Sequence, residues 1–357
     1  MAEFGGVYSA RRVLITGHTG FKGSWLTVWL NHLGADITGV ALPPQGKKNH
    51  WDLLALQVVD KRLDIRDEFA VKKAFADSAP EIVFHLAAQP LVRRSYMAPL
   101  ETWETNVIGT ANVLEACRHT PSVKAVVCVT TDKCYEDQNW VWGYRESDRL
   151  GGHDPYSASK ASAELVASSY RSAYFTDQCS VLLATARAGN VIGGGDWSED
   201  RLIPDLVRAL EENKSLEVRM PQAVRPWQHV LDSLSGYLCL GEALLSGEQA
   251  AEGWNFGPGL DGNGKVVDVL NLLKAHWSHL QWHCSDRALL HETSILRLDN
   301  TKARTRLHWE PVWSLAEALR HTAEWYSALL ESGEVITKRQ LKKYCDDARS
   351  VHLKWAL

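Results

Sequence analysis

Tyr156 and Lys160 stand four residues apart, so a helix through this segment would place a phenol and an ammonium on one face. A free Tyr titrates near about 10, and a neighbouring cation favours its phenolate form. The pair could therefore remove a proton from a hydroxyl group. A half-buried Tyr beside a solvated Lys is the alternative for an isolated match, so the meaning of the pair depends on the motifs around it.

Thr131, Asp132 and Lys133 form a second cluster of reactive side chains. They directly follow the apolar run 125–129, which we expect to be a buried strand. Active-site groups of open α/β sheets gather at such strand ends. A solvated ion pair between Asp132 and Lys133 is the plainer interpretation when this segment is taken by itself.

Three glycines, Gly17, Gly20 and Gly23, lie between the β-branched run 12–16 and the helical segment 24–30. In such a strand–turn–helix the first glycine permits a tight turn and the second lets the backbone approach a diphosphate. The third allows the helix and the strand to pack closely, and N–H groups at the helix start would bind the phosphates. The sequence therefore predicts a dinucleotide site.

Phe21 and two unusual residues, His18 and Lys22, stand inside this turn. Lys22 could contact the diphosphate or crowd it, and a solvated Lys on the first helical turn is the alternative. We interpret His18 and Lys22 as modulators of cofactor affinity.

The run 40–43, after the second expected strand, supplies no acid to hold an adenosine ribose. The residues alone therefore do not establish NAD as the cofactor. Further along, Asp64 and Ile65 follow another strand. Asp64 could bond the adenine amino group, or it could cap the next helix.

Short β-branched runs alternate with amphipathic segments in the first half, which is typical of a parallel α/β sheet. From residue 193 onward, Gly, Pro and Trp interrupt shorter elements. We predict a doubly wound parallel (Rossmann) sheet with a smaller, mixed C-terminal lobe. Residues 1–187, completed by roughly 228–258, would hold the dinucleotide, and 188–227 with 259–357 would mainly hold the substrate. The predicted strands are 12–16, 37–41, 82–85, 125–129 and 180–184, and the predicted helices include 71–77 and 102–119.

Composition excludes several classes of protein. With 357 residues, 45% of them hydrophobic, the chain is long and apolar enough for a large globular core. A net charge of -4 without long runs of one sign argues against a nucleic-acid partner or a basic membrane face. Seven scattered Cys without a C-x-x-C motif favour reduced thiols over disulfides or a metal site. Without a signal core or a long apolar stretch, we expect a soluble, cytoplasmic protein.

The chain resembles the extended short-chain dehydrogenase/reductase family over almost its whole length. The motifs that carry this resemblance are the glycine turn, Asp64-Ile65, His85-Leu86-Ala87-Ala88-Gln89, Asn106, and Tyr156 to Lys160. The resemblance implies NAD as the cofactor, with residues 86–88 passing beneath it and Asn106 beside it. It also implies that Tyr156, its pKa lowered by Lys160 and the nicotinamide charge, is the base, and that Lys160 holds the nicotinamide ribose. Helices around 102–119 and Tyr156 would form a homodimer interface.

Within this family, the Thr131-Asp132-Lys133 run resembles the sugar-nucleotide 4,6-dehydratases that act on CDP-glucose. Thr131 would assist oxidation, and Asp132 would protonate the leaving hydroxyl. Lys133 replaces the usual Glu base, and an ammonium has no lone pair, so Lys133 could take the carbon-5 proton only with a depressed pKa. Alternatively, Lys133 stabilises enolate charge while another group takes the proton.

In the second half, Asn190 and Arg201 lie in a segment that resembles the family's nucleotide-sugar loop, and Arg225 matches an arginine that binds the same diphosphate. The resemblance implies dehydration of CDP-D-glucose to CDP-4-keto-6-deoxy-D-glucose in deoxysugar biosynthesis of the O-antigen or lipopolysaccharide type. The alternatives are a 4,6-dehydratase of another NDP-hexose, an NDP-sugar 4-epimerase, which needs no acid at position 132, and a non-catalytic scaffold.

Overall fold

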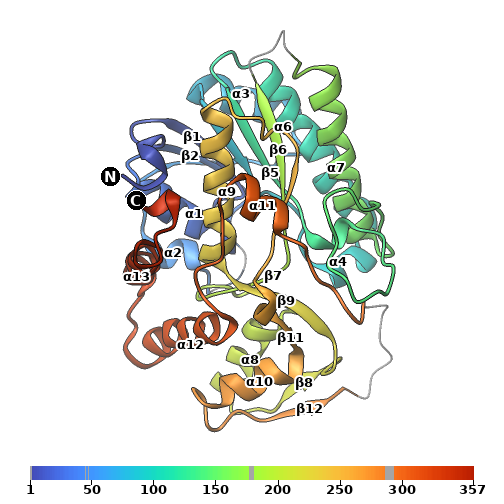
Figure 1. The fold of residues 1–357 in the computed structure, drawn as a ribbon, viewed down its shortest axis with the longest axis vertical. Coiled ribbons are helices and arrows are strands. Elements are labelled where there is room, and N and C mark those ends of the chain that lie inside the picture. The colour runs from blue at the N-terminus through green and yellow to red at the C-terminus, as the bar shows by residue number, and fades with distance from the viewer. Residues whose placement is uncertain (1, 45, 47, 177–180, 286–292) are drawn as a thin grey trace.

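The β-branched runs of the first half pair with one another in a parallel sheet (Figure 1). The computed structural model describes residues 2–44, 46, 48–176, 181–285 and 293–357. Within these residues seven strands, each parallel to its neighbours, lie in the order β10-β6-β5-β4-β1-β2-β3. Their bounds are β1 Arg12–Thr16, β2 Asp36–Ala41, β3 Val59–Arg62, β4 Ile82–His85, β5 Ala125–Val129, β6 Leu182–Ala188 and β10 Gly253–Phe256.

Helices cover both faces of this sheet. Alternate residues of each strand point to opposite faces, and the apolar side chains on each face pack against helices. On β1, Val13 and Ile15 belong to a core shared with helices α1 and α9. Leu14 belongs to a separate core shared with α3, α6 and α7, so the predicted doubly wound arrangement is confirmed. The bounds of these helices are α1 Phe21–His32, α3 Glu68–Ser78, α6 Gly109–Arg118, α7 Pro155–Ala173 and α9 Val230–Leu245.

The strand order reverses between β1 and β4, which pair directly. Doubly wound sheets bind their ligands outside the carboxyl ends of the strands at such a point. The glycine turn follows β1, residues 86–88 follow β4, and the 131–133 cluster follows β5. The fold thus brings three motifs that are distant in the sequence to one edge of the sheet.

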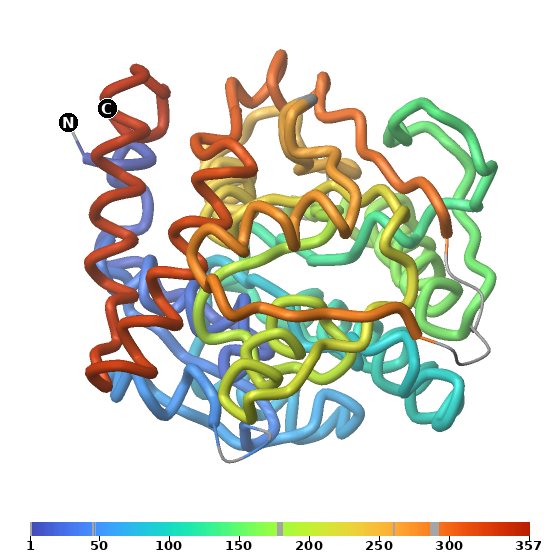
Figure 2. The backbone as a smooth tube through the Cα atoms, turned by 90° about the horizontal axis from the view of Figure 1, so that it is seen from below, coloured from blue at the N-terminus to red at the C-terminus, as the bar shows by residue number. Residues whose placement is uncertain are grey.

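The second half adds the smaller lobe below the sheet in Figure 1, which Figure 2 shows from below. Among the described residues it holds one sheet in the order β11-β9-β7 and another of β12 and β8. β9 pairs antiparallel with β11 and parallel with β7, so this lobe is mixed, as predicted. The bounds are β7 Asn190–Ile192, β8 Leu216–Val218, β9 Val224–His229, β11 Asn263–Lys265, β12 Trp282–Cys284, α8 Leu202–Glu211, α10 Val266–Lys274 and α12 Leu315–Ser332.

Two predicted elements differ in detail from the structure. The strand expected at 180–184 is β6, which begins at Leu182 and continues to Ala188, and residue 180 lies outside the described part. The helix expected at 102–119 is divided into α5, a π-helical segment η2 and α6. The other elements are α2 His50–Leu54, α4 Val92–Met97, α5 Pro99–Trp103, α11 Thr301–Arg306, α13 Thr337–Ser350, η1 Glu3–Gly6, η2 Glu104–Ile108, η3 Asp132–Cys134, η4 Leu260–Gly262 and η5 Lys354–Ala356. None of the helices described is both long and apolar enough to cross a membrane.

Candidate active site

The glycine turn between β1 and α1 brings the backbone close to any ligand bound there. Gly17 has a φ of +76°, and a Cβ at this position would lie 2.7 Å from the backbone nitrogen of Ala87. A Cβ on Gly23 would lie 2.1 Å from the carbonyl oxygen of Gly17, so a larger residue would push α1 away from the turn. Gly20 is the N-cap of α1, whose first N–H groups have no acceptor within the helix. The turn therefore fits a dinucleotide diphosphate.

His18 is buried beside this turn, and its ring is held by protein groups. Nε2 lies 3.0 Å from Asp60 Oδ1, and the ring meets Trp51 edge-on with centroids 4.5 Å apart. The ring also covers Gly39 of β2, where an added Cβ would lie 2.4 Å from His18 Cγ. Burial lowers the pKa of His18, and the neighbouring Asp60 opposes that shift. The imidazole therefore affects the turn through packing.

Lys22 carries its ammonium from the glycine turn toward the predicted catalytic residues. Nζ donates a hydrogen bond to the hydroxyl of Tyr237 on α9, 3.1 Å away. Burial, followed by the charges of Arg201 and Lys160, lowers the pKa of Lys22 to about 7. Asp132 acts on this pKa in the opposite direction. Lys22 is thus close to both the dinucleotide turn and the catalytic cluster.

Asp64 and Ile65, the predicted adenine contacts, are held by neighbouring residues. Asp64 Oδ1 accepts from the backbone N–H of Arg66 at 2.9 Å, and Oδ2 pairs with its guanidinium at 2.6 Å. The alternative that Asp64 caps the next helix is wrong, because Asp67 caps α3. Ile65 is buried against Gly109 at the start of α6. Asp64 can therefore bind adenine only through the carboxylate lone pairs that Arg66 does not occupy.

Residues 86–88 follow β4, and Thr16, the last residue of β1, holds the start of this run by hydrogen bonds. The N–H groups of Leu86 and Ala87 both donate to Thr16 Oγ1, each over 3.1 Å. Ala88 follows directly. This arrangement holds the backbone of the run against the glycine turn, which contacts Ala87 through Gly17.

Asn106, in the π-helical segment η2, is fully engaged with protein groups through its amide nitrogen. Nδ2 donates to the carbonyl of Gln89 at 3.1 Å and to Ser159 Oγ at 2.9 Å. Oδ1 accepts from the N–H of Gln89 at 2.8 Å. Because Nδ2 has only two hydrogens, Asn106 has no further donor to offer a cofactor. It ties the run after β4 to the helix that carries Tyr156.

Thr131 and Asp132 lie where β5 ends, and both are buried. Thr131 Oγ1 donates to Asp132 Oδ1 at 3.1 Å and accepts from the N–H of Lys133 at 3.4 Å. Asp132 Oδ2 is buried without a hydrogen-bond partner within the described chain. Burial raises the pKa of Asp132, with Lys133 the first of the groups that oppose the shift. This carboxyl is suited to hold a proton and donate it to a substrate.

Tyr156 and Lys160 lie on α7, which Asp154 caps by accepting the N–H of Ser157 at 2.9 Å. Burial raises the pKa of Tyr156 to about 12, although a hydrogen bond with Thr131 opposes the rise. Lys160 Nζ donates to the carbonyl of Val129 at 3.2 Å, and its effect on the pKa of Tyr156 beside a bound nicotinamide stays a prediction. In this state only a further positive charge could bring the phenol toward neutral pH.

A buried ion pair that the sequence reading missed lies behind the catalytic cluster. Arg187 binds both carboxylate oxygens of Glu164, at 2.9 and 2.8 Å, and Thr185 donates to the same carboxylate at 2.7 Å. Thr130, next to Thr131, is a further donor. Burial raises the pKa of Glu164, but the charge and hydrogen bonds of Arg187, together with the hydrogen bonds of Thr130 and Thr185, outweigh burial, so the pKa is lowered and the carboxylate stays charged. Glu164 follows Lys160 by four residues, a spacing that could have indicated its inward position.

The predicted substrate residues lie on the second lobe. Arg201 pairs with Asp196 at 2.8 Å, and its charge lowers the pKa of Tyr156, so it is close to the catalytic phenol. Arg225 on β9 is buried and lowers the pKa of Asp132 in the same way. Asn190 on β7 is in register with Trp227, two residues beyond Arg225.

The glycine turn also meets this lobe directly. The ring of Phe21 lies against Gly193, where an added Cβ would be 3.3 Å from Cζ.

Four residues near the site have no role predicted from the sequence: Tyr237, Asp196, Glu164 and His85. Tyr237 carries no local signal, because its partner Lys22 is 215 residues away in the sequence, whereas Asp196 pairs with Arg201 only five residues later.

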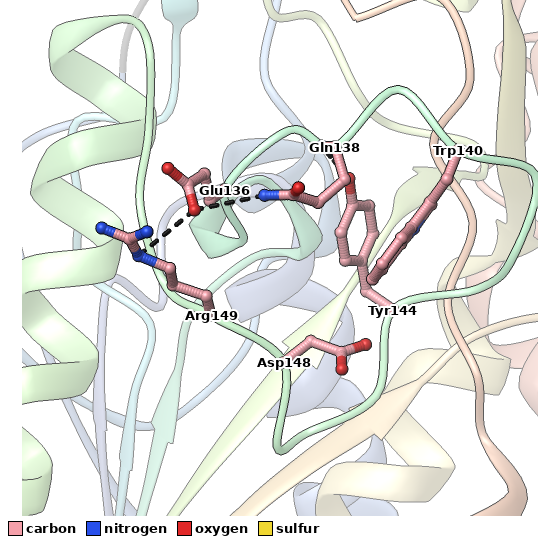
Figure 3. Close-up of a pocket in the computed structure, with 6 residues that line it drawn as sticks. All are labelled: Glu136, Gln138, Trp140, Tyr144, Asp148 and Arg149. Atoms are coloured by element: carbon pink, nitrogen blue, oxygen red, sulfur yellow. Dashed lines mark hydrogen bonds and ion pairs between the residues drawn. The ribbon is translucent and has the colours of Figure 1, made fainter.

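The loop that follows the catalytic cluster surrounds a pocket of about 290 Å³ (Figure 3). Inside the loop, Glu136 binds Gln138 and Arg149, both at 3.2 Å. The Tyr144 ring stacks on Tyr135 with centroids 5.0 Å apart. These contacts support Tyr135, two residues beyond Lys133. The pocket is lined by Glu136, Gln138, Trp140, Tyr144, Asp148 and Arg149.

The site combines a Rossmann sheet, a glycine turn, a helix with Tyr156 and Lys160, and a second lobe. The chain belongs to the NAD dependent epimerase/dehydratase family, whose model matches residues 13–257. The chain is 44% identical to the CDP-glucose 4,6-dehydratase of Salmonella typhimurium over 348 residues, which cover 94% of this chain and 97% of that protein. It is 27% identical to a probable dTDP-glucose 4,6-dehydratase of Sinorhizobium fredii, over 90% of this chain and 93% of the relative.

Solved structures support the same architecture. The UDP-glucose 4-epimerase of Thermotoga maritima, crystallised with UDP-glucose, superposes with a TM-score of 0.77 at 25% identity, covering 89% of this chain and 99% of that one. The dTDP-glucose 4,6-dehydratase of Bacillus anthracis, in complex with NAD, gives a TM-score of 0.74 over 90% of this chain and 98% of that one. At 22% identity, the second comparison bears on the fold alone.

Proposed function

We propose that this chain dehydrates CDP-D-glucose to CDP-4-keto-6-deoxy-D-glucose and water, for deoxysugar biosynthesis of the O-antigen or lipopolysaccharide type. The observation that carries the proposal is the buried Asp132 carboxyl beside Tyr156, with its pKa raised by burial. A 4-epimerase has no use for such an acid. The similarity to the Salmonella typhimurium CDP-glucose 4,6-dehydratase over nearly the whole chain supports CDP-glucose as the substrate.

NAD is the cofactor, and the residues present fit it. The glycine turn would hold the diphosphate, residues 86–88 would lie beneath the cofactor, and Tyr156 with Lys160 would hold the nicotinamide ribose. When bound, NAD takes a hydride from carbon 4 of the sugar and returns it to carbon 6. The three glycines pack closely, and their lack of side chains lets a diphosphate approach the backbone.

Tyr156 would take the proton of the 4-hydroxyl, with Thr131 bonded to the same oxygen. Thr131 lies close enough to Tyr156 to lower the pKa of its phenol. Because burial raises the pKa of Tyr156 to about 12, the phenolate needs the positive charge of a bound nicotinamide ring. The resulting carbon-4 ketone acidifies the proton on carbon 5.

Asp132 would donate its proton to the departing 6-hydroxyl, so that water leaves and an enone remains. Its buried Oδ2, which has no partner within the described chain, is the oxygen available for this transfer. Lys133 would either accept the carbon-5 proton or stabilise the enolate while another group takes that proton. Hydrogen exchange at carbon 5 in a Lys133→Met variant separates the two, because undiminished exchange excludes Lys133 as the base.

Asn190, Arg201 and Arg225 would bind the substrate diphosphate, since a guanidinium fork matches phosphate oxygens. In this division the nucleotide sugar lies on residues 188–227 and 259–357, and NAD lies on 1–187 completed by 228–258. The position of β10 in the large sheet supports assigning 228–258 to the cofactor part. Arg201 and Arg225, through their effects on Tyr156 and Asp132, support substrate binding toward the same centre.

We also infer a cytoplasmic homodimer. Exposed apolar side chains lie on α5, η2 and α7, which pack side by side and would form a four-helix interface with a second copy. A reducing compartment suits the five buried free thiols of Cys117, Cys128, Cys134, Cys239 and Cys345.

The decisive experiment supplies CDP-, dTDP-, GDP- and UDP-glucose to the purified protein, each with and without added NAD. We expect a 4-keto-6-deoxy product, detected by its absorbance in alkali, from CDP-glucose, and none from a Tyr156→Phe control. Preferred turnover of another nucleotide would reassign the substrate. A galactose-configured product would make the protein an epimerase, and binding without turnover would make it a scaffold.

A further inference from the structure

His85, the last residue of β4, lies at the centre of a buried chain of hydrogen bonds that joins the dinucleotide turn to the Tyr156 helix. Its Nδ1 lies 2.7 Å from Thr16 Oγ1, and its Nε2 lies 3.0 Å from Thr110 Oγ1. All three side chains are buried. His85 is therefore held at both ring nitrogens.

The hydrogen bonds in this chain favour one assignment of donors and acceptors. Thr16 Oγ1 accepts the N–H of Ala87 and shares the N–H of Leu86 with the carbonyl oxygen of Thr16, 3.0 Å away, so its own hydrogen is directed to Nδ1 of His85. At the other side, Thr110 donates its hydrogen to the carbonyl of Asn106 at 2.7 Å. Nε2 of His85 must therefore carry a hydrogen and donate it to Thr110.

The assignment requires a neutral ring. An imidazolium would present an N–H to Thr16 Oγ1 in competition with the N–H groups of Leu86 and Ala87. Burial and then the charge of Lys160 lower the pKa of His85 to about 3, in agreement with the neutral form. The ring thus acts as a fixed acceptor on one side and a fixed donor on the other.

On the donor side the chain continues to the catalytic helix. Thr110 fixes the carbonyl of Asn106 in the π-helical segment, and Asn106 Nδ2 donates to Ser159 Oγ at 2.9 Å. Ser159 in turn donates to the carbonyl of Tyr156 at 2.7 Å. The position of Tyr156 therefore depends on the segment that His85 supports.

We propose that His85 is a positioning residue with two separable functions, one at each ring nitrogen. Through Nδ1 and Thr16 it sets the amides of residues 86–87 that lie beneath NAD, and through Nε2 and Thr110 it sets the helix of Tyr156. The second function rests on the proposed catalytic function of Tyr156. The first concerns cofactor binding alone.

Two substitutions at the same position separate the functions. In His85→Asn, Oδ1 stands where Nδ1 was and still accepts from Thr16, but nothing reaches Thr110. In His85→Gln, Nε2 still reaches Thr110, but Thr16 loses its acceptor. A lost buried hydrogen bond corresponds to about a tenfold effect. We expect His85→Gln to weaken NAD binding about tenfold by calorimetry, with kcat at saturating NAD unchanged, and His85→Asn to lower kcat about tenfold with unchanged NAD affinity.

Thr110→Val is the matched variant for the donor side, because it keeps the side-chain volume and removes the hydroxyl. It should reproduce His85→Asn, and the double variant should lose no more than either single one. Hydrogen exchange of the first turn of α7 should rise in His85→Asn and Thr110→Val but not in His85→Gln. This measurement and NAD calorimetry need no turnover, so both functions remain testable if the protein dehydrates no nucleotide sugar.

Parallel losses of NAD affinity and of kcat in both His85 variants, in proportion to the fall in Tm, would overturn the proposal and make His85 a core residue only. Unchanged NAD affinity and unchanged exchange in both variants would overturn it as well.

Discussion

At neutral pH the Asp132 carboxyl has to retain a proton if it is to protonate a leaving hydroxyl. Burial raises its pKa, which favours this state, while Lys133, Thr131 and Arg225 limit the rise. The same side chain is superfluous for interconverting hydroxyl configurations at carbon 4. Asp132 is therefore the residue at which dehydration and epimerisation differ.

Asp132→Asn should keep the shape of the site and remove the proton donor. We expect kcat for dehydration to fall by roughly 10²–10⁴, the usual contribution of general acid catalysis. Oxidation at carbon 4 should persist, so reduced nicotinamide should accumulate and be visible by its absorbance. Asp137→Asn, at an exposed position of the following loop, is the matched control and should retain full activity. Full dehydration by Asp132→Asn would remove Asp132 from the mechanism.

Lys22 opposes a second positive charge near Tyr156, where the nicotinamide ring would lie. Below pH 7 we expect Lys22→Met to bind NAD about tenfold more tightly, because one like-charge interaction of about 1.4 kcal/mol is removed. The pKa of Lys22 is lowered to about 7, so the ammonium is charged below that pH and neutral above it. NAD affinity of the native protein should therefore rise as pH increases through 7, whereas the affinity of Lys22→Met should stay level.

Calorimetric titrations with NAD at several pH values measure both effects. Lys73→Met on the exposed face of α3 changes the net charge equally and should behave like the native protein. A pH-independent affinity of the native protein would show that the Lys22 charge does not reach the cofactor.

At the scale of elements, α9 links the sheet to the C-terminal helix α13 through a buried acid in its first turn. Asp232 Oδ1 accepts from the hydroxyl of Tyr344 and from the N–H of Val312, both at 2.7 Å. Oδ2 is buried without a partner in the described chain. Burial raises the pKa of Asp232 from 3.8 to about 7, so the folded protein keeps this carboxyl protonated where the unfolded chain does not.

The sign of the resulting pH dependence follows from the raised pKa. The contribution of Asp232 to stability is fully present below its unfolded pKa near 3.8 and is lost as pH rises through about 7. Each unit of pKa shift corresponds to about 1.4 kcal/mol. Asp232→Asn keeps the Oδ1 acceptor and cannot ionise, so its free energy of unfolding should vary less with pH between these values. Urea unfolding of both proteins across this range provides the measurement, and identical pH slopes would contradict the assignment.

Some of these elements could be predicted from the sequence and others could not. Strand ends, the glycine turn and α7 were predictable because their periodicity and glycine spacing are local. The hydrogen-bond partners of Asn106 and Lys160 were not, because Gln89 and Val129 come near them only in the folded sheet. The sequence equally allows Asp64 or Asp67 as the cap of α3, and the fold uses Asp67.

For the whole molecule, the doubly wound sheet and the mixed second lobe were predictable from the alternation of elements and its loss after residue 193. Contacts between the lobes were not. The ring of Phe21 on α1 lies against Gly193 of the second lobe, and no local pattern encodes that contact. The catalytic centre combines a turn, three strand ends and two arginines of the second lobe, so its electrostatics exist only in the complete fold.

The outer face of α5, η2 and α7 is the place where the whole molecule would meet a second copy. Leu100, Ile108 and Leu165 are 75%, 54% and 61% exposed there, although each is apolar. Burying such side chains contributes about 25 cal/mol per Å², which a charge at the centre of the face would oppose. Leu165→Asp should therefore convert a dimer into a monomer in light scattering after gel filtration.

Leu272→Asp is the matched control, since Leu272 is 41% exposed on α10 of the other lobe (Figure 1). It introduces the same charge far from α7 and should leave the dimer intact. Because each catalytic cluster is built from one chain, the Leu165→Asp monomer should still bind NAD. If the interface contributes stability, the Tm of the native protein should fall on dilution, and the Tm of Leu165→Asp should not. A native protein that is already monomeric, or a Leu165→Asp variant that remains dimeric, would show that this face does not form the interface.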